Sequence, residues 1–362
     1  MKETVATTQT AGAEVSTSKM AVETIKTQLI GKEEVFKILA IGKAMQTPIL
    51  LIGSPGVSKT ACVLDYAKAN YGGDYSKMMQ EAFILETDEG TKSSEVKGTL
   101  DIEQLVMDNK YAINAPITSA KYVVINEVDK ASSGLRNALM GIMNEHILFS
   151  GKEKVPCEWN TFVATCNEIP KEEIKSPFWD RFLIKHTVER VTAAQMLKYF
   201  KNGDKDFHLE IKQNCPTEDQ VKAVNVPHEK LEIFMGSVRN RITDRTLTFV
   251  PKLTRVISLI YGIGIDSALV KAAVMLTGDT SLGKELDKKL APAEKRAVLD
   301  KIDLLSGIQD EGQLQSATTE IENLVNKYEK AGKLTEQDIA EITKVIEDVM
   351  RTHPIVNFQG ID

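Results

Sequence analysis

Apolar residues along the chain gather in short runs that alternate with amphipathic stretches. The runs cover residues 48–52, 81–87, 121–126, 161–167 and 182–191, and each predicts a buried strand. Between them, residues 59–70 and 132–146 carry apolar side chains at helical spacing, and Ser132 or Ser133 is a suitable cap for the second helix. Strands that alternate with helices predict a mostly parallel sheet with helices on both faces.

The two ends of the chain follow another pattern. Residues 21–46 are apolar at helical spacing, and Gly31 predicts a break between two short helices. After Thr192 no strand pattern is recognised and a helical one prevails, as in residues 251–264. Two stripes near the end are separated by a turn at Gly332 and Thr335, and core packing is favoured over a partner-binding face for both; their members are Ile321, Leu324, Val325 and Tyr328, then Ile339, Ile342, Ile346 and Val349.

Composition narrows the class of protein. The 362 residues are 42% hydrophobic and 27% charged, which is typical of globular proteins, and the net charge of −6 gives no general footprint for nucleic acid. No apolar run approaches the roughly 20 residues of a membrane span, and residues 1–20 have the character of a flexible tail rather than a signal peptide. The 4 cysteines lack CxxC spacing, so we expect reduced thiols and a cytoplasmic location, and the 5 histidines lack metal-ligand spacing.

The clearest motif is the loop between the strand at 48–52 and the helix that follows. It resembles the phosphate-binding pattern G-x-x-x-x-G-K-[ST], with Ser58 at the place of the last glycine. A small residue with a free N–H meets the same need, while Lys59 can reach the β- and γ-phosphates of ATP and Thr60 can bind Mg²⁺. A plain strand-to-helix turn is the alternative. The predicted nucleotide-binding residues are Gly53, Ser54, Pro55, Gly56, Val57, Ser58, Lys59 and Thr60.

Three further side chains could complete a hydrolytic site. Glu127 follows a buried strand, at the sheet edge where ligands of open α/β sheets bind, and could orient the attacking water. Asn167 ends the next strand and could contact the γ-phosphate or the water. Arg181 follows an aromatic pair, and it is a surface cation unless the protein forms a ring, in which case it could act on a neighbour's nucleotide.

The order of these segments resembles that of the MoxR family of AAA+ ATPases over about residues 28–275. In that family a small residue is usual at the position of Ser58. The segment "SSEVKGT" resembles the family's Ser-Asp-x-x-Gly, with Glu95 for Asp, and "NEVDKASSGLRNALMGIMNE" resembles its Walker B strand and following helix. "FSGKEKVP" resembles its hairpin, "ATCNE" its first sensor strand and "FWDRF" its arginine-finger segment.

The resemblance implies an α/β P-loop AAA+ core at 21–190, an α-helical lid at 191–281 and a helical C-terminal extension at 282–362. It makes Glu127 the catalytic glutamate, Asn167 the first sensor and Arg181 the finger that acts on a neighbouring subunit. Arg255 would be the lid arginine, although Leu253 stands where the family's Ser-x-Arg has its serine. The implied cofactors are ATP and Mg²⁺.

One position departs from the family pattern. The family's Walker B motif reads Asp-Glu, whereas this chain has Asn126 before Glu127. Asn keeps the shape of Asp but removes the charge that supports Mg²⁺, so we expect weakened metal affinity and slow hydrolysis. Asp129 lies beyond the strand, at a position where the family has Asn, and is not expected to compensate.

The resemblance implies an ATP-dependent ring, expected to be hexameric, that remodels or assembles client proteins together with a protein containing a von Willebrand factor A domain. Residues 87–101 would be the insert that faces the pore or the client. Two alternatives remain. A nucleic-acid-dependent motor is disfavoured by the acidic balance, and a structural ring that ATP holds together without hydrolysis is favoured by Asn126.

Overall fold

The centre of the molecule is a parallel sheet. The computed structural model describes residues 21–352, apart from 101, 103–105, 108–112, 151–152, 174–175, 202–208, 306, 309 and 335. The 5-stranded sheet has the order β10-β2-β9-β6-β3, and every neighbouring pair is parallel. Its strands are β2 (Ile49–Ile52), β3 (Ala82–Glu86), β6 (Tyr122–Asn126), β9 (Thr161–Cys166) and β10 (Ile184–Thr187). The predicted sheet and its strands are confirmed.

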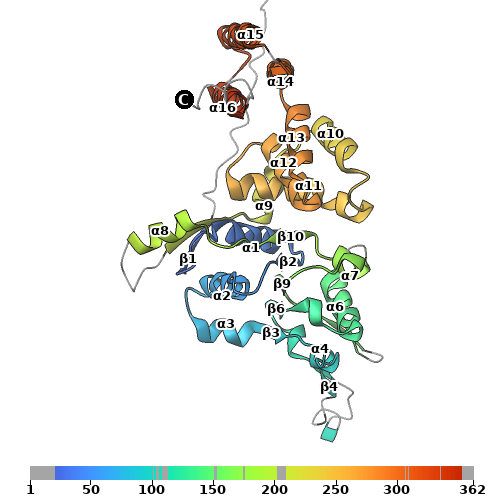
Figure 1. Ribbon diagram of the computed structural model, residues 1–362. Coiled ribbons are helices and arrows are strands. Elements are labelled where there is room, and N and C mark those ends of the chain that lie inside the picture. Colours follow the sequence, from blue (N-terminus) through green and yellow to red (C-terminus); the bar gives the residue numbers. More distant parts are fainter. Residues whose placement is uncertain are drawn as a thin grey trace, which may run out of the picture.

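Helices cover both faces of this sheet (Figure 1). On one face Leu51 and Val124 share an apolar core with α1 (Glu33–Met45) and α2 (Lys59–Asn70). On the other face Leu50, Val123 and Ile125 share a core with α6 (Ser133–Glu145), which Ser132 caps through its side chain. Because successive strand residues point to opposite faces and both faces are buried, the strands are continuous apolar runs.

The prediction of a helix in residues 21–30 is wrong. Residues Ala21–Thr27 form strand β1, which pairs antiparallel with β11 (Leu209–Cys215), so the prediction that strands end before Thr192 is also wrong. In β1 the buried residues Ile25 and Thr27 alternate with exposed ones, which is the period of a half-buried strand. The second predicted helix is confirmed as α1, and Gly31 before it has a positive φ of 66°.

Helices dominate the chain after β10. They are α8 (Ala193–Lys201), α9 (Glu218–Ala223), α10 (His228–Val238), α11 (Asp244–Tyr261), α12 (Ile265–Thr277) and α13 (Thr280–Leu290). Buried residues of α10 to α13 belong to the same apolar core as α1 and α2, so these helices pack directly on one side of the sheet domain. Among the described helices no single one could cross a membrane; α11 and α12 meet the length and composition test only as a pair, which is bent by 113°.

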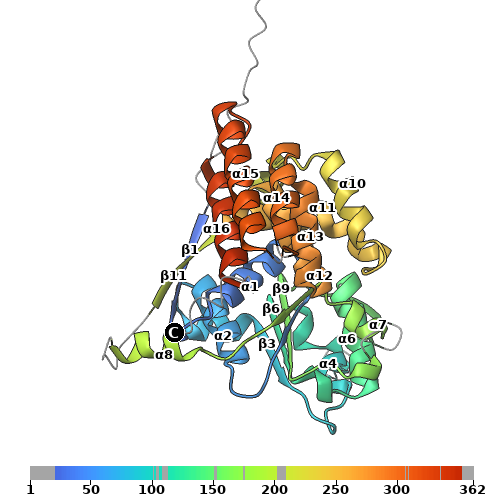
Figure 2. The same ribbon diagram turned by 45° about the horizontal axis from the view of Figure 1, so that its top comes forward.

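The last described helices form a separate cluster, α14 (Ala293–Leu305), α15 (Glu311–Lys330) and α16 (Glu336–Thr352) (Figures 1 and 2). Ile321, Val325 and Ile342 are buried in its core. The other members of the two predicted stripes pack against that core, namely Leu324, Tyr328, Ile339, Ile346 and Val349. Core packing of both stripes is therefore confirmed.

Several shorter helices and strands lie in the segments that connect the strands of the central sheet. The predicted hairpin is confirmed as β7 (Ile147–Ser150) and β8 (Glu153–Pro156), which pair antiparallel. Residues 88–100 are mostly polar and contain two glycines, a composition that predicts an exposed loop. That prediction is wrong in part, because the segment contains α4 (Ser94–Lys97) with Val96 fully buried, and β4 (Thr99–Leu100) paired with β5 (Ile113–Asn114). The remaining elements are α3 (Tyr75–Glu81), α7 (Pro177–Asp180), η1 (Pro116–Thr118), η2 (Val128–Lys130) and η3 (Lys171–Glu173).

Candidate active site

The loop at residues 53–58 joins the end of β2 to the start of α2, so its amide groups lie at a helix N-terminus. Ser58 has a φ of 68° in the left-handed region, which explains why the general pattern has glycine at this place. Gly53 is required for space, since a Cβ there would lie 2.7 Å from the carbonyl oxygen of Val188. The backbone therefore has the shape of a phosphate-binding loop despite Ser58.

Lys59 crosses the mouth of this loop. Its Nζ donates hydrogen bonds to the carbonyl oxygens of Gly53 at 2.5 Å and Ser54 at 3.2 Å, and to Oδ1 of Asn167 at 3.4 Å. Within the described part of the chain Lys59 has no ion pair with a carboxylate, so its charge is available to an anion. Lys59 and Asn167, which were each predicted to contact a nucleotide, thus lie together at the same edge of the sheet.

Asn126 lies at the end of β6 and is 1% exposed. Its Oδ1 accepts hydrogen bonds from the hydroxyls of Thr60 at 3.0 Å and Thr165 at 3.1 Å. Its Nδ2 donates to Oε1 of Glu86 at 2.6 Å. The two predicted metal-binding residues, Thr60 and Asn126, are therefore in direct contact. Glu86, which the sequence did not indicate, joins the same hydrogen-bonded cluster through the Asn126 amide.

Glu127 follows Asn126 with a left-handed φ of 55°. Its Oε2 accepts a 2.5 Å hydrogen bond from Nζ of Lys130, and both side chains are about half exposed. The ion pair raises the pKa of Lys130. An exposed pair of this kind contributes little to stability, so it constrains the Glu127 side chain only weakly.

The donor set fits Mg²⁺ bound together with nucleotide phosphates. The described residues hold no cluster of three or more His, Cys, Asp or Glu side chains that could bind a metal alone. Mg²⁺ takes oxygen ligands and is usually bound by one or two carboxylates together with water and substrate phosphates. The Thr60 hydroxyl and the Asn126 amide oxygen are uncharged oxygen donors at the end of the phosphate loop, so water and phosphate oxygens would supply most of the ligands.

A pocket of about 420 Å³ opens beside the phosphate loop. Its size lies in the range of small-ligand sites, and it could take the rest of a nucleotide. The lining residues outside the loop were not recognised in the sequence, because they come from three separate segments; they are Lys32, Arg190, Val191 and Met196.

Arg181 lies at the opposite edge of the sheet from the phosphate loop. It precedes the N-terminal end of β10, whereas the loop follows the C-terminal end of the adjacent parallel strand β2. Four strand residues at about 3.3 Å each separate the two edges by about 13 Å before any loop is counted. Arg181 therefore lies apart from the phosphate loop of its own chain.

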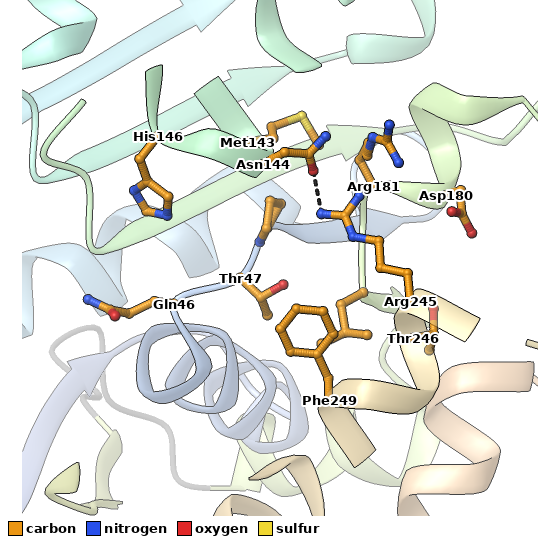
Figure 3. A pocket seen from close by; sticks show the side chains of 12 residues that line it. Gln46, Thr47, Met143, Asn144, His146, Asp180, Arg181, Arg245, Thr246 and Phe249 are labelled. Atoms are coloured by element: carbon orange, nitrogen blue, oxygen red, sulfur yellow. Dashed lines mark hydrogen bonds between the residues drawn. The ribbon is translucent and has the colours of Figure 1, made fainter. Parts of the chain in front are cut away.

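A second arginine lies beside Arg181 (Figure 3). Arg245, at the start of α11, lines the same pocket of about 160 Å³, and its Nη2 donates a 2.5 Å hydrogen bond to Oδ1 of Asn144. Burial lowers the pKa of Arg245, and the positive charge of Arg181 lowers it further. Asp180 lines the same pocket, and the negative charges of Asp180 and Glu145 partly oppose this lowering, so the two guanidinium groups share the pocket with a carboxylate.

Arg255 does not join this pair. It lies about 15 Å farther along α11 by helical rise, and its Nε is buried without a hydrogen-bond partner among the described residues. The signal for Arg245 was present in the sequence, because Thr243-Asp244-Arg245 has the Ser-x-Arg spacing with threonine for serine. Thr243 caps α11, which begins at Asp244, so Arg245 lies in the first turn of the helix.

Comparisons with known proteins agree with this architecture. The family model of the MoxR domain in MoxR-vWA-beta-propeller ternary systems matches residues 16–226, more than half of the chain. The chaperone MoxR1 of Mycobacterium tuberculosis is 26% identical over 180 residues, which cover 49% of this chain and 45% of that protein. The uncharacterized protein MJ0079 of Methanocaldococcus jannaschii is 24% identical over 203 residues, 54% of this chain and 50% of its own.

A crystal structure of a candidate ATPase from Cytophaga hutchinsonii superposes with a TM-score of 0.52 at 16% identity, covering 69% of this chain and 82% of that one, which shows a shared fold. This chain spans about half the length of the curated relatives it matches. The family match extends from before β1 to beyond β11 and includes the phosphate loop and the sheet that carries it. The chain belongs to the MoxR family of AAA+ ATPases.

Proposed function

We propose that this chain is an ATP- and Mg²⁺-binding subunit of a ring, in which each active centre is completed by a neighbouring copy. One observation carries the proposal. The phosphate loop with Lys59 and Glu127 lies at one edge of the parallel sheet, whereas the paired arginines, Arg181 and Arg245, lie at the other edge. A head-to-tail arrangement of copies brings these two edges together and closes into a ring when the rotation permits.

Each residue then has a defined task. The loop amides at residues 53–58 and Lys59 bind the phosphates, and Thr60 and Asn126 hold the metal side of the site. Bound Mg²⁺ would neutralise charge on the β- and γ-phosphate oxygens. Glu127 orients the attacking water. Asn167, which contacts Lys59, is positioned to act as the first sensor near the γ-phosphate.

The neighbour supplies positive charge. Arg181 and Arg245 of the adjacent copy would stabilise the charge that develops on the γ-phosphoryl group, as an arginine finger does. Of the two lid arginines considered, Arg245 is the better candidate because it lies beside Arg181, and a role for Arg255 remains a prediction. We expect a hexamer.

The biological role follows from family membership. A chaperone-like activity in which ATP turnover remodels or assembles a client protein is our first proposal, with a von Willebrand factor A domain protein as partner, in line with the ternary systems of the matching family model. Residues 87–101 would contact the client, and a cytoplasmic location is expected. A structural ring that binds but does not hydrolyse ATP is the second candidate, and Asn126 favours it. A nucleic-acid-dependent motor is less favoured because the net charge is −6.

The test is ATP hydrolysis against Mg²⁺ concentration, with sedimentation in the presence and absence of ATP. Lys59→Ala should abolish nucleotide binding, whereas Glu127→Gln should abolish hydrolysis but keep binding and assembly. Lys68→Ala, the same change at an exposed position of α2, is the matched control. Nucleotide-dependent assembly without turnover would select the structural ring, and no nucleotide binding at all would refute the proposal.

A further inference from the structure

The starting observation is a cross-strand pair at the metal side of the site. Glu86 ends β3, Asn126 ends β6, and the two residues are direct partners in the parallel register. Thr87 locks these strand ends together, since its hydroxyl bonds the carbonyl oxygens of Asn126 at 2.8 Å and Glu127 at 2.7 Å. The position of Glu86 beside Asn126 is therefore set by the sheet and not by a loop.

The hydrogen bonds of Asn126 fix the orientation of its amide. Because Oδ1 accepts from both Thr60 and Thr165, the donor Nδ2 must face the other way, toward Glu86 at 2.6 Å. An aspartate at 126 could accept both hydroxyls equally well. Its second oxygen would then meet the Glu86 carboxylate at hydrogen-bond distance, and two anions so placed repel each other. Asparagine at 126 can therefore donate a hydrogen bond to the Glu86 carboxylate, whereas aspartate at 126 would repel it.

Other nearby carboxylates have other partners. Glu127 pairs with Lys130, and Oδ2 of Asp129 accepts from the backbone N–H of Asn167 at 3.3 Å. Glu86 is exposed, so its carboxylate is in contact with water at the same sheet edge as Thr60. Among the carboxylates that the structure describes, that of Glu86 accepts a hydrogen bond from the Asn126 side chain.

We propose that Glu86 carries the negative charge that position 126 lacks, so that the acidic function of the Walker B strand has moved to the neighbouring strand. This inference rests on the proposed ATP and Mg²⁺ site. Glu86 is a positioning residue: it holds the Asn126 amide with Oδ1 toward Thr60, and its charge favours a hydrated divalent cation there. The loss of Mg²⁺ affinity expected from Asn126 is accordingly offset in part.

The experiment measures binding of the fluorescent analogue mant-ATP to the full chain over a range of free Mg²⁺, from EDTA to millimolar. Glu86→Gln keeps the size and a hydrogen-bond acceptor but removes the charge. Glu86→Gln should raise the Mg²⁺ concentration at which half of the Mg²⁺-dependent gain in mant-ATP binding is reached by roughly two- to tenfold. It should leave mant-ATP binding in EDTA unchanged. Glu89→Gln removes the same charge from the exposed loop just beyond β3 and should have no effect.

The decisive variant restores the charge at the other position. In Glu86→Gln with Asn126→Asp, the Mg²⁺ requirement should return close to that of the natural chain, because one carboxylate and one amide again face each other. Asn126→Asp alone should lower the melting temperature in Mg²⁺-free buffer, and adding Glu86→Gln should recover it. That melting temperature reports on the pair without any bound nucleotide.

The outcomes separate this inference from the proposed function. If the natural chain fails to bind mant-ATP, both fail. If it binds, and Glu86→Gln behaves like Glu89→Gln, the nucleotide site stands but the charge assigned to Glu86 is refuted. Strictly additive effects of Glu86→Gln and Asn126→Asp on both the Mg²⁺ requirement and the melting temperature would also refute the pairing.

Discussion

Arg136 connects the turn after β6 to the segment that carries Arg181, and its removal gives a sharp stability prediction. From α6, its Nη2 donates to the carbonyl oxygen of Asp129 at 2.7 Å and its Nη1 to Oε2 of Glu173 at 2.5 Å. Its guanidinium also lies 5.6 Å and 5.4 Å from the ring centroids of Phe178 and Trp179 on α7. Replacement by methionine keeps an unbranched apolar stem in place of the arginine methylenes and removes all three kinds of contact.

The magnitude follows from burial. The Arg136 side chain is 16% exposed and that of Glu173 is 37% exposed, so the pair lies between a surface ion pair and a buried one. A surface pair contributes about 0.2–1 kcal/mol, whereas breaking a buried one costs about 3–5 kcal/mol. With a cation–π contribution of about 1 kcal/mol, we expect Arg136→Met to lower the free energy of unfolding by about 3 kcal/mol. Arg136→Lys keeps the charge but loses the planar fork, so its loss should be about half as large.

The assay is urea denaturation followed by circular dichroism, with ATP hydrolysis measured on the same samples. Because α7 leads directly into Arg181, hydrolysis should fall more than nucleotide binding. Arg239→Met, at an exposed position, is the matched control and should stay within about 0.5 kcal/mol of the natural chain. An Arg136→Met variant as stable as that control would refute the reasoning.

Gly98→Ala should disturb the segment around β4, because φ is 71° and a Cβ would clash with the backbone of β5; client remodelling should fall while mant-ATP binding persists. Asp279 caps α13, and hydrogen bonds led by that from Ser281 lower its pKa from 3.8 to about 2. Its stabilising effect is therefore present above pH 3.8 and lost toward pH 2, so the difference in melting temperature between the natural chain and Asp279→Asn should shrink over that range. Burial raises the pKa of Cys62 and Cys166 to about 12, so mass spectrometry should find both thiols unlabelled by a thiol reagent at pH 8 until urea is added; rapid labelling of the folded chain would contradict this.

The central sheet could be predicted from the sequence because its strands are buried on both faces. Such strands form continuous apolar runs, and the polar residues that end them, Glu127 and Asn167, mark the edge where the phosphate loop lies. Strand β1 was missed for the opposite reason. It is half buried, it pairs with β11 far along the chain, and its few apolar residues fit helical spacing as well as strand spacing.

Two site residues depended on tertiary structure. The role of Glu86 appears only once β3 and β6 are placed in register, which periodicity within either strand does not reveal. Arg245 was not singled out in the sequence, where Arg255 was assigned as the lid arginine, and only the packing of α11 brings Arg245 beside Arg181. In both cases the residue that lies beside it in the structure is distant in sequence.

The most direct test of the central claim, that one copy completes the active centre of another, is a subunit-mixing assay. Lys59→Ala and the double variant Arg181→Ala with Arg245→Ala should each lack ATP hydrolysis. When the two variants are mixed and allowed to assemble, the mixture should regain a measurable fraction of the ATP hydrolysis of the natural chain. The reason is that some interfaces then combine an intact phosphate loop with intact arginines. The control is a mixture of Lys59→Ala with a triple variant that carries Lys59→Ala, Arg181→Ala and Arg245→Ala. It should stay inactive, because no subunit in it has an intact phosphate loop. Absence of recovery at every mixing ratio, with assembly verified by sedimentation, would contradict the account.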